Sequence, residues 1–278
     1  MHPTTIAEQL FFATVYISAQ TVAGQSWVGT AFLISHPVAD GTSIFLVTNK
    51  HVLEQADQLD VRLVRKDAHG GPDEGATQLN ISDFSAGAWV GHPDPAVDVA
   101  VMPFRMILNQ MIEQGGAPYF IAIGHEHLMT TEQEASLDAI EAVGFIGYPS
   151  GLFDTANFLP IARIGHTASP PINNYRGHPA FLIDASVYPG SSGSPVYILN
   201  TLGWADKNGT INYGAPRFIL MGVLAAVHER QLLGEVVDMP TKLVALTNSP
   251  INLGIVFKAS AIQTCVNELV AKYGPVSG

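Results

Sequence analysis

A run of small residues between two apolar segments places the strongest constraint on this chain. Gly190-Ser191-Ser192-Gly193-Ser194 follows the apolar stretch 180–187 and precedes the stretch 196–199. A linker would have polar flanks, so the run is typical of a tight turn between two strands. Its glycines let several backbone N–H groups point at one spot, where a hydroxyl can attack a carbonyl and the amides can receive the oxyanion. The alternative is a Ser/Gly β-turn that carries no chemistry, since such turns are common.

Two further motifs precede this turn. The first is Gly29-Thr30-Ala31-Phe32, which opens an apolar run and is followed by Val47-Thr48-Asn49-Lys50-His51. The second is Asp98-Val99-Ala100-Val101. Each motif is weak alone, but together they place a histidine, an aspartate and a serine in a fixed order along the chain.

Together the three motifs resemble those of the trypsin-like (chymotrypsin-fold) serine proteases, and most closely the bacterial, HtrA-like members without disulfides. The resemblance covers about residues 10–258. The order histidine, aspartate, serine separates this family from the subtilisins and the α/β-hydrolases. The resemblance implies that His51 is the general base, Asp98 the orienting acid and Ser192 the nucleophile, with the amides of Gly190 and Ser192 as the oxyanion hole.

Short apolar and β-branched runs, separated by turns, predict an all-β fold. With the resemblance, this gives one trypsin-like peptidase domain over residues 1–278, made of two packed six-stranded antiparallel β-barrels. We expect the first barrel at about 10–104, beginning with a strand at 11–17, and the second at about 119–258, beginning with a strand at 119–123. Apolar residues at helical spacing predict a C-terminal helix at about 259–272, ended by Gly274. About 20 residues after the last predicted strand are too few for the PDZ domain of HtrA proteins.

Composition narrows the function classes. Hydrophobic residues make up 47% of the 278 and charged residues 13%, which predicts a sizeable core. The net charge of −11 argues against nucleic acid and against anionic membrane surfaces as partners. We expect a protein or peptide substrate and neither a metal nor an organic cofactor; the sequence does not determine the oligomeric state.

Cysteine usage and the N-terminal residues bear on localisation. Cys265 is the only cysteine, so no internal disulfide can form, which favours a reducing compartment. The first lysine or arginine is Lys50, so the positive region of an export signal is missing. We therefore predict a cytoplasmic protein, with a bacterial periplasm as the open alternative.

The resemblance also implies a primary specificity pocket. In the family its floor lies six residues before the nucleophile, which is Ser186 here, and its wall is the strand that resembles residues 221–228. The predicted wall residues are Ala225, Ala226, Val227 and His228. A serine floor offers no charge to a cationic side chain. We therefore expect the pocket to bind an uncharged, apolar side chain of the substrate. A register shift that brings in Asp184 would favour Lys or Arg, and a role for His228 and Arg230 would favour an acidic residue.

Three rival interpretations stay open at this point. The chain can be a catalytically silent binding module with a protease fold. Ser192, Asp206 and His228 can form a Ser–Asp–His hydrolase site, which requires alternating strands and helices. His125-Glu126-His127 can hint at a metal, but two histidines two residues apart are more typical of a solvated loop.

Overall fold

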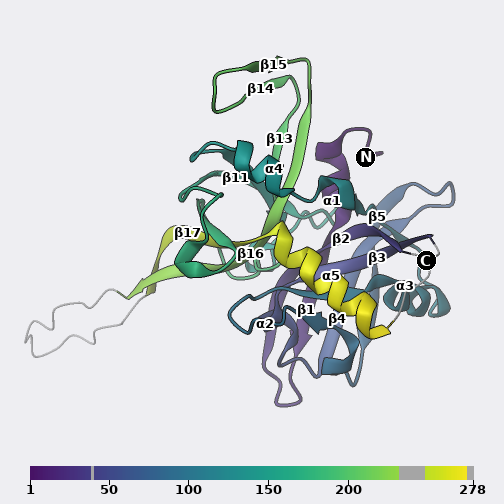
Figure 1. Ribbon diagram of the computed structural model, residues 1–278. Coiled ribbons are helices and arrows are strands. Elements are labelled where there is room, and N and C mark those ends of the chain that lie inside the picture. Colours follow the sequence, from purple (N-terminus) through teal and green to yellow (C-terminus); the bar gives the residue numbers. More distant parts are fainter. Residues whose placement is uncertain (39–40, 232–247, 274–278) are drawn as a thin grey trace, which may run out of the picture.

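The computed structural model describes residues 1–38, 41–231 and 248–273, and strands dominate it (Figure 1). The first half of the chain forms a nine-stranded sheet in the order β5-β4-β1-β2-β3-β7-β6, with β8 on β4 and β9 on β2. Six of its strands are longer: β1 (Thr14–Gln20), β2 (Ser26–Val38), β3 (Gly41–Thr48), β4 (Gln58–Lys66), β5 (Pro72–Ile81) and β7 (Ala100–Pro103). Three have two residues each: β6 (Val90–Gly91), β8 (Pro118–Tyr119) and β9 (Ile123–Gly124).

The second half forms the closed barrel β10-β11-β12-β17-β16-β13. Its strands are β10 (Ala142–Gly147), β11 (Ile161–Thr167), β12 (Ala180–Asp184), β13 (Pro195–Asn200), β16 (Arg217–Gln231) and β17 (Asn248–Lys258). A small hairpin of β14 (Gly203–Ala205) and β15 (Ile211–Tyr213) projects from it, as does the far end of the β16–β17 ribbon (Figure 1). The predicted all-β fold with a six-stranded second barrel is confirmed.

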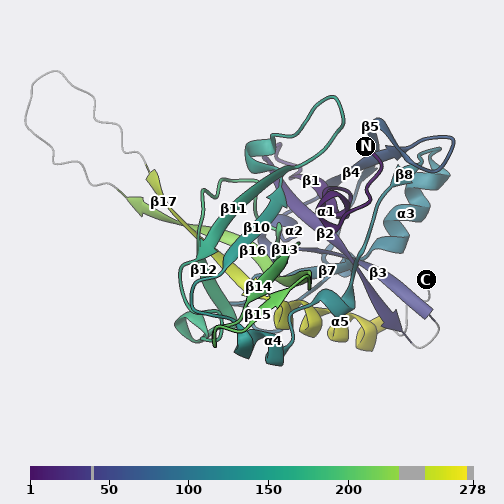
Figure 2. The same ribbon diagram turned by 90° about the horizontal axis from the view of Figure 1, so that it is seen from above.

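Helices connect and cover the strands. They are α1 (Ile6–Ala13), α2 (Lys50–Leu53), α3 (Phe104–Glu113), α4 (Thr131–Ser136) and α5 (Ala259–Tyr273), with short 3-10 turns η1 (Ala86–Ala88), η2 (His125–His127), η3 (Pro149–Gly151) and η4 (Tyr175–Gly177). The predicted C-terminal helix is confirmed as α5, which runs along strands of both halves (Figure 2). Its predicted end at Gly274 lies outside the described residues.

Three local expectations differ from the structure. The strand predicted at 11–17 begins only at Thr14, because a capping box between Thr5 and Glu8 starts helix α1 and carries it to Ala13. The strand predicted at 119–123 splits into β8 and β9, which pair with β4 and β2 of the first half rather than with the second barrel. Over the described residues, the first sheet runs from β5 to β6 without closing into the expected barrel.

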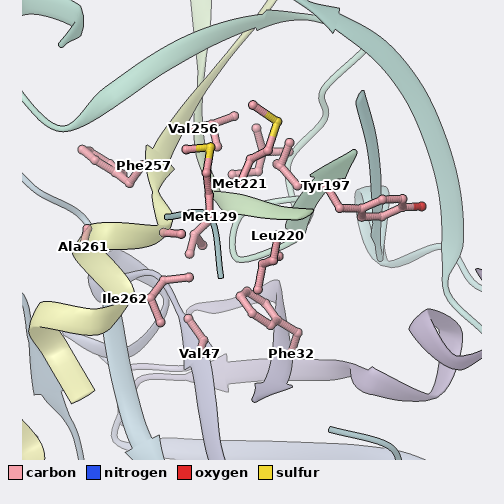
Figure 3. Packing of buried hydrophobic residues seen from close by; sticks show 14 of the residues in the cluster. Phe32, Val47, Met129, Tyr197, Leu220, Met221, Val256, Phe257, Ala261 and Ile262 are labelled. Carbon is pink, nitrogen blue, oxygen red and sulfur yellow. The ribbon is translucent and has the colours of Figure 1, made fainter. Parts of the chain in front are cut away.

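Two clusters of buried side chains join the halves. In one, Phe32 and Val47 of the first sheet pack with Leu220 of the barrel and Ile262 of α5, all fully buried (Figure 3). The other is aromatic: the Tyr16 ring of β1 meets the Tyr148 ring, which follows β10, edge to face with 5.1 Å between centroids. Because interiors are close-packed, these contacts fix the position of one half against the other.

Within the described ranges, we find no helix that is both long enough and apolar enough to cross a membrane.

Candidate active site

Ser192 lies in the turn between β12 and β13, and glycines on both sides of it are required by the backbone. Gly190 has φ +88° and Gly193 has φ +90°, a region that favours glycine. A Cβ on Gly193 would also lie 1.8 Å from the carbonyl oxygen of Thr30, and one on Gly190 would lie 2.4 Å from that of Tyr148. The turn therefore packs backbone to backbone against β2 and against the turn after β10.

His51 and Asp98 form a two-point contact. The Nδ1 atom of His51 lies 2.5 Å from Oδ2 of Asp98, and the backbone N–H of His51 donates to Oδ1 over 3.1 Å. The His51 side chain is 47% exposed and that of Asp98 26%. With Nδ1 held by the carboxylate, the ring presents Nε2 on its opposite side, which is the arrangement a general base needs.

The residues just before His51 hold the loop that carries Asp98. The buried Asn49 donates from Nδ2 to the Asp98 carbonyl over 2.5 Å, and the buried Lys50 donates from Nζ to the Asp94 carbonyl over 2.9 Å. The Asp94 carboxylate accepts from the N–H of Ala96. The structure thus brings Asp98, and not Asp94, to His51.

Ser192 lines the same cleft as His51, but its hydroxyl donates elsewhere. Its Oγ atom donates to the carbonyl of Ala225 on β16 over 2.9 Å. This hydrogen bond must break before the hydroxyl can donate to His51. Catalytic hydrogen bonds are often long or poorly aligned when no substrate is bound, so this orientation is compatible with a nucleophilic serine.

The amides of Gly190 and Ser192 are available to a ligand. Within the described ranges, neither N–H donates to another protein group. The carbonyl of Pro189 accepts from the N–H of Ser150 over 2.5 Å. Because the carbonyl and the N–H of a trans peptide point in opposite directions, this bond turns the Gly190 N–H away from Ser150.

Thr30 is the polar centre of the contact between the halves, and it is fully buried. Its Oγ1 donates to the Gly190 carbonyl over 2.7 Å and accepts from the Tyr148 N–H over 3.0 Å. Its backbone N–H donates to the Ser192 carbonyl over 2.8 Å, and its own carbonyl accepts from Oγ1 of Thr48 over 2.7 Å. One residue of β2 thus fixes the backbone on both sides of Ser191.

Thr30 and Asn49 lie within the sequence motifs, but no role was predicted for either residue. A signal was present for Thr30, because a hydroxyl in the otherwise apolar run of Ala31 and Phe32 must find a partner once buried. Ser191, which precedes Ser192, is 1% exposed, and its Oγ has no hydrogen-bond partner among the described residues.

The predicted pocket residues are only partly described. Ser186 is half-buried just after β12, and Ala225 is buried on β16, beside Ser192. The backbone of Ala226, Val227 and His228 continues β16, with register shifts on both sides of Ala226 and Val227, and their side chains lie outside the described residues. Asp184 ends β12 with an exposed side chain.

The rival sites are placed as follows. His125, Glu126 and His127 form the turn η2, with ring nitrogens 3.3 and 3.7 Å from the glutamate, and the part of the chain that is described contains no group of three or more ligands suited to a metal. Asp206 accepts from the N–H groups of Asn208 and Thr210 in the β14–β15 hairpin. The antiparallel barrel around Ser192 also lacks the alternating strands and helices of the alternative hydrolase fold.

Comparison with known proteins agrees with this fold. A family model described as a trypsin-like peptidase domain matches residues 29–201. Among solved structures, the protease Anisep from Arthrobacter nicotinovorans is similar, with a TM-score of 0.50 and 15% identity over 94% of this chain and 96% of that chain. The active form of the Rv3671c protease from M. tuberculosis has a TM-score of 0.47 and 18% identity over 98% of this chain and 84% of that one. No curated protein matches significantly.

The Thr30 contacts can be tested with a pair of variants. We expect Thr30→Val, which keeps the side-chain shape, to lower the free energy of unfolding by about 1–3 kcal/mol and to slow reaction of Ser192 with a fluorophosphonate probe. Thr30→Ser keeps the hydroxyl and should restore most of the labelling rate. Chemical denaturation and the labelling rate of the folded variants measure the two effects. A Thr30→Val variant that labels as fast as the parent would show that the hydroxyl does not position the turn.

Proposed function

Because this chain belongs to the trypsin-like peptidase family, we propose that it is a serine endopeptidase that works through His51, Asp98 and Ser192. The family and the fold support proteolysis in general, and the serine mechanism is our proposal. The observation that carries it is the two-point contact of Asp98 with the ring and the backbone of His51, beside a serine that lines the same cleft.

Acylation follows from the placement of these groups. The Ser192 hydroxyl leaves the Ala225 carbonyl, donates to Nε2 of His51 and attacks the substrate carbonyl as the imidazole takes its proton. Asp98 stabilises the imidazolium through Nδ1. The N–H groups of Gly190 and Ser192 bind the oxyanion of the tetrahedral intermediate. The imidazolium then protonates the leaving amine, and the C–N bond breaks to give an acyl-enzyme.

Deacylation repeats these steps with water. His51 takes a proton from the water as its oxygen attacks the acyl carbonyl, and the same two amides bind the new oxyanion. The intermediate collapses when the imidazolium returns the proton to Ser192 Oγ. The acid product leaves, and the free serine is restored.

One observation favours a second candidate function, a catalytically silent module with a protease fold. In the structure the Ser192 hydroxyl donates to the Ala225 carbonyl and not to His51. If this bond persists when a substrate is bound, the serine has no base. Labelling with a fluorophosphonate separates the two candidates, because only an assembled triad reacts rapidly with this probe.

The nucleophile is tested by serine replacements. We expect the parent chain to be labelled by a fluorophosphonate and to cleave peptides, and Ser192→Ala to lose both activities. Ser191→Ala and Ser194→Ala are matched controls in the same turn and should keep measurable activity. Labelling is read by intact mass and cleavage by peptide mapping. Full activity of Ser192→Ala would exclude this serine as the nucleophile, and an unreactive parent chain would favour the silent module.

The acid is tested by a matched pair of carboxylates. Asp98→Asn should fold normally but lower kcat by about 10⁴-fold, because the amide stabilises the wrong tautomer of His51. Asp94→Asn is the control, since Asp94 does not contact His51, and it should stay within a few-fold of the parent. Steady-state kinetics with circular dichroism as a folding check measure both. The opposite ranking would assign the role to Asp94.

We extend the proposal to the residue on the acyl side of the cleaved bond, which should be uncharged and apolar. Ser186 lies half-buried and Ala225 buried near the nucleophile, and neither offers a charge to a buried ionic side chain. Cut sites in a diverse peptide library, mapped by mass spectrometry, measure this preference. Predominant cleavage after Lys or Arg would instead implicate Asp184, and cleavage after Asp or Glu would implicate His228 and Arg230.

A further inference from the structure

A cleft of about 430 Å³ lies beside His51 and Ser192, and its other lining residues are Trp27, Val28, Glu54, Gln55, Pro189 and Gly190. Neither Ser186 nor Ala225, which we assign to the acyl side, lines it. A cleft that flanks His51 and is separate from these two residues suits the side where the leaving amine departs, because His51 must reach that amine to protonate it.

Glu54 gives this cleft its charge. It follows His51 by three residues, and its N–H donates to the Lys50 carbonyl over 2.8 Å, so the helical turn of α2 continues through it. Residues three apart on such a turn share a face. The Glu54 carboxylate is exposed, and across the ranges that the structure describes no cationic side chain pairs with it.

The remaining walls suit a long side chain with a charged end. The indole N–H of Trp27 donates to the Val52 carbonyl over 3.1 Å, which holds the ring against α2. Trp27 and Val28 belong to β2 and are half-buried. Aromatic rings attract cations, and an aliphatic stem packs on apolar walls while its charged end reaches solvent.

We propose that this cleft binds an arginine or lysine side chain on the amine side of the cleaved bond, with Glu54 as its charge partner. This inference rests on the proposed function and names part of the substrate: an apolar residue before the cleaved bond and a basic residue within the first two positions after it. Asp98 does not compete for the basic side chain, because His51 occupies its carboxylate.

The experiment uses the acyl-enzyme itself. A peptide ester acylates Ser192, and the acyl-enzyme is then divided between water and an added amine, which binds where a leaving amine would be. The amines are arginylglycinamide and its neutral isostere citrullylglycinamide, together with glycylargininamide and glycylcitrullinamide to locate the position. The parent chain should prefer the arginyl amine over the citrullyl one by about fivefold, an effect typical of a solvent-exposed ion pair.

Three variants test whether Glu54 causes the preference for the arginyl amine. The ratio of arginyl to citrullyl product should fall to about one in Glu54→Gln and below one in Glu54→Lys. In the parent chain this ratio should decrease as the salt concentration is raised. Glu113→Gln makes the same charge change at the end of α3, away from the cleft, and should keep the parent ratio. Because the measured quantity is a ratio of products from one acyl-enzyme, it does not depend on the rate of acylation.

The outcomes separate this inference from the function on which it rests. An acyl-enzyme that forms but does not discriminate between the amines overturns the inference, while the proposed serine endopeptidase function is retained. A preference that survives in Glu54→Gln overturns the role of Glu54. A parent chain that forms no acyl-enzyme overturns the proposed function and the inference together.

Discussion

The geometry of the candidate site depends on a single buried hydroxyl. Thr30 Oγ1 joins the Gly190 carbonyl to the Tyr148 N–H, while the Thr30 backbone binds the Ser192 carbonyl. An unsatisfied buried hydroxyl or carbonyl is costly, so the turn and β2 must stay in register for all of these groups to be satisfied. The turn that carries Ser192 is thus positioned by a strand of the opposite half, and not by its own barrel alone.

This dependence explains why the site lies where the halves meet. The first half supplies His51 and Asp98, and the second supplies Ser192 with its neighbouring amides. Neither half can form the site alone, and the two apolar clusters that join them keep the parts in register. A change in packing at Phe32 or Tyr148, neither of which lines the cleft, would therefore alter the alignment of Ser192 and His51.

The turn around Ser192 was easier to predict from sequence than the elements around it. The glycines at 190 and 193 are dictated by the local backbone, so a sequence motif was enough to place the turn. The strand expected at 119–123 was found in sequence but given the wrong neighbours, because pairing with β2 and β4 is set by distant residues. Helix α1 was missed because the capping pair Thr5 and Glu8 outweighs the β-leaning residues that follow. The orientation of the Ser192 hydroxyl could not be predicted from sequence, because it depends on a group that is close in space but distant in the chain, the Ala225 carbonyl.

Helix α5 gives the protein a built-in order of events during synthesis. Its Ile262 and Leu269 pack in one cluster with Val97 and Val101, and the thiol of Cys265 donates to the Val99 carbonyl over 3.6 Å. Strand β7, which follows Asp98, therefore packs against residues that are synthesised long after it. A nascent chain in which only the first half has emerged carries His51 and Asp98 without this support and without Ser192. The candidate site is therefore incomplete until the second half has been made, and the segment around Asp98 gains its final packing only when α5 docks.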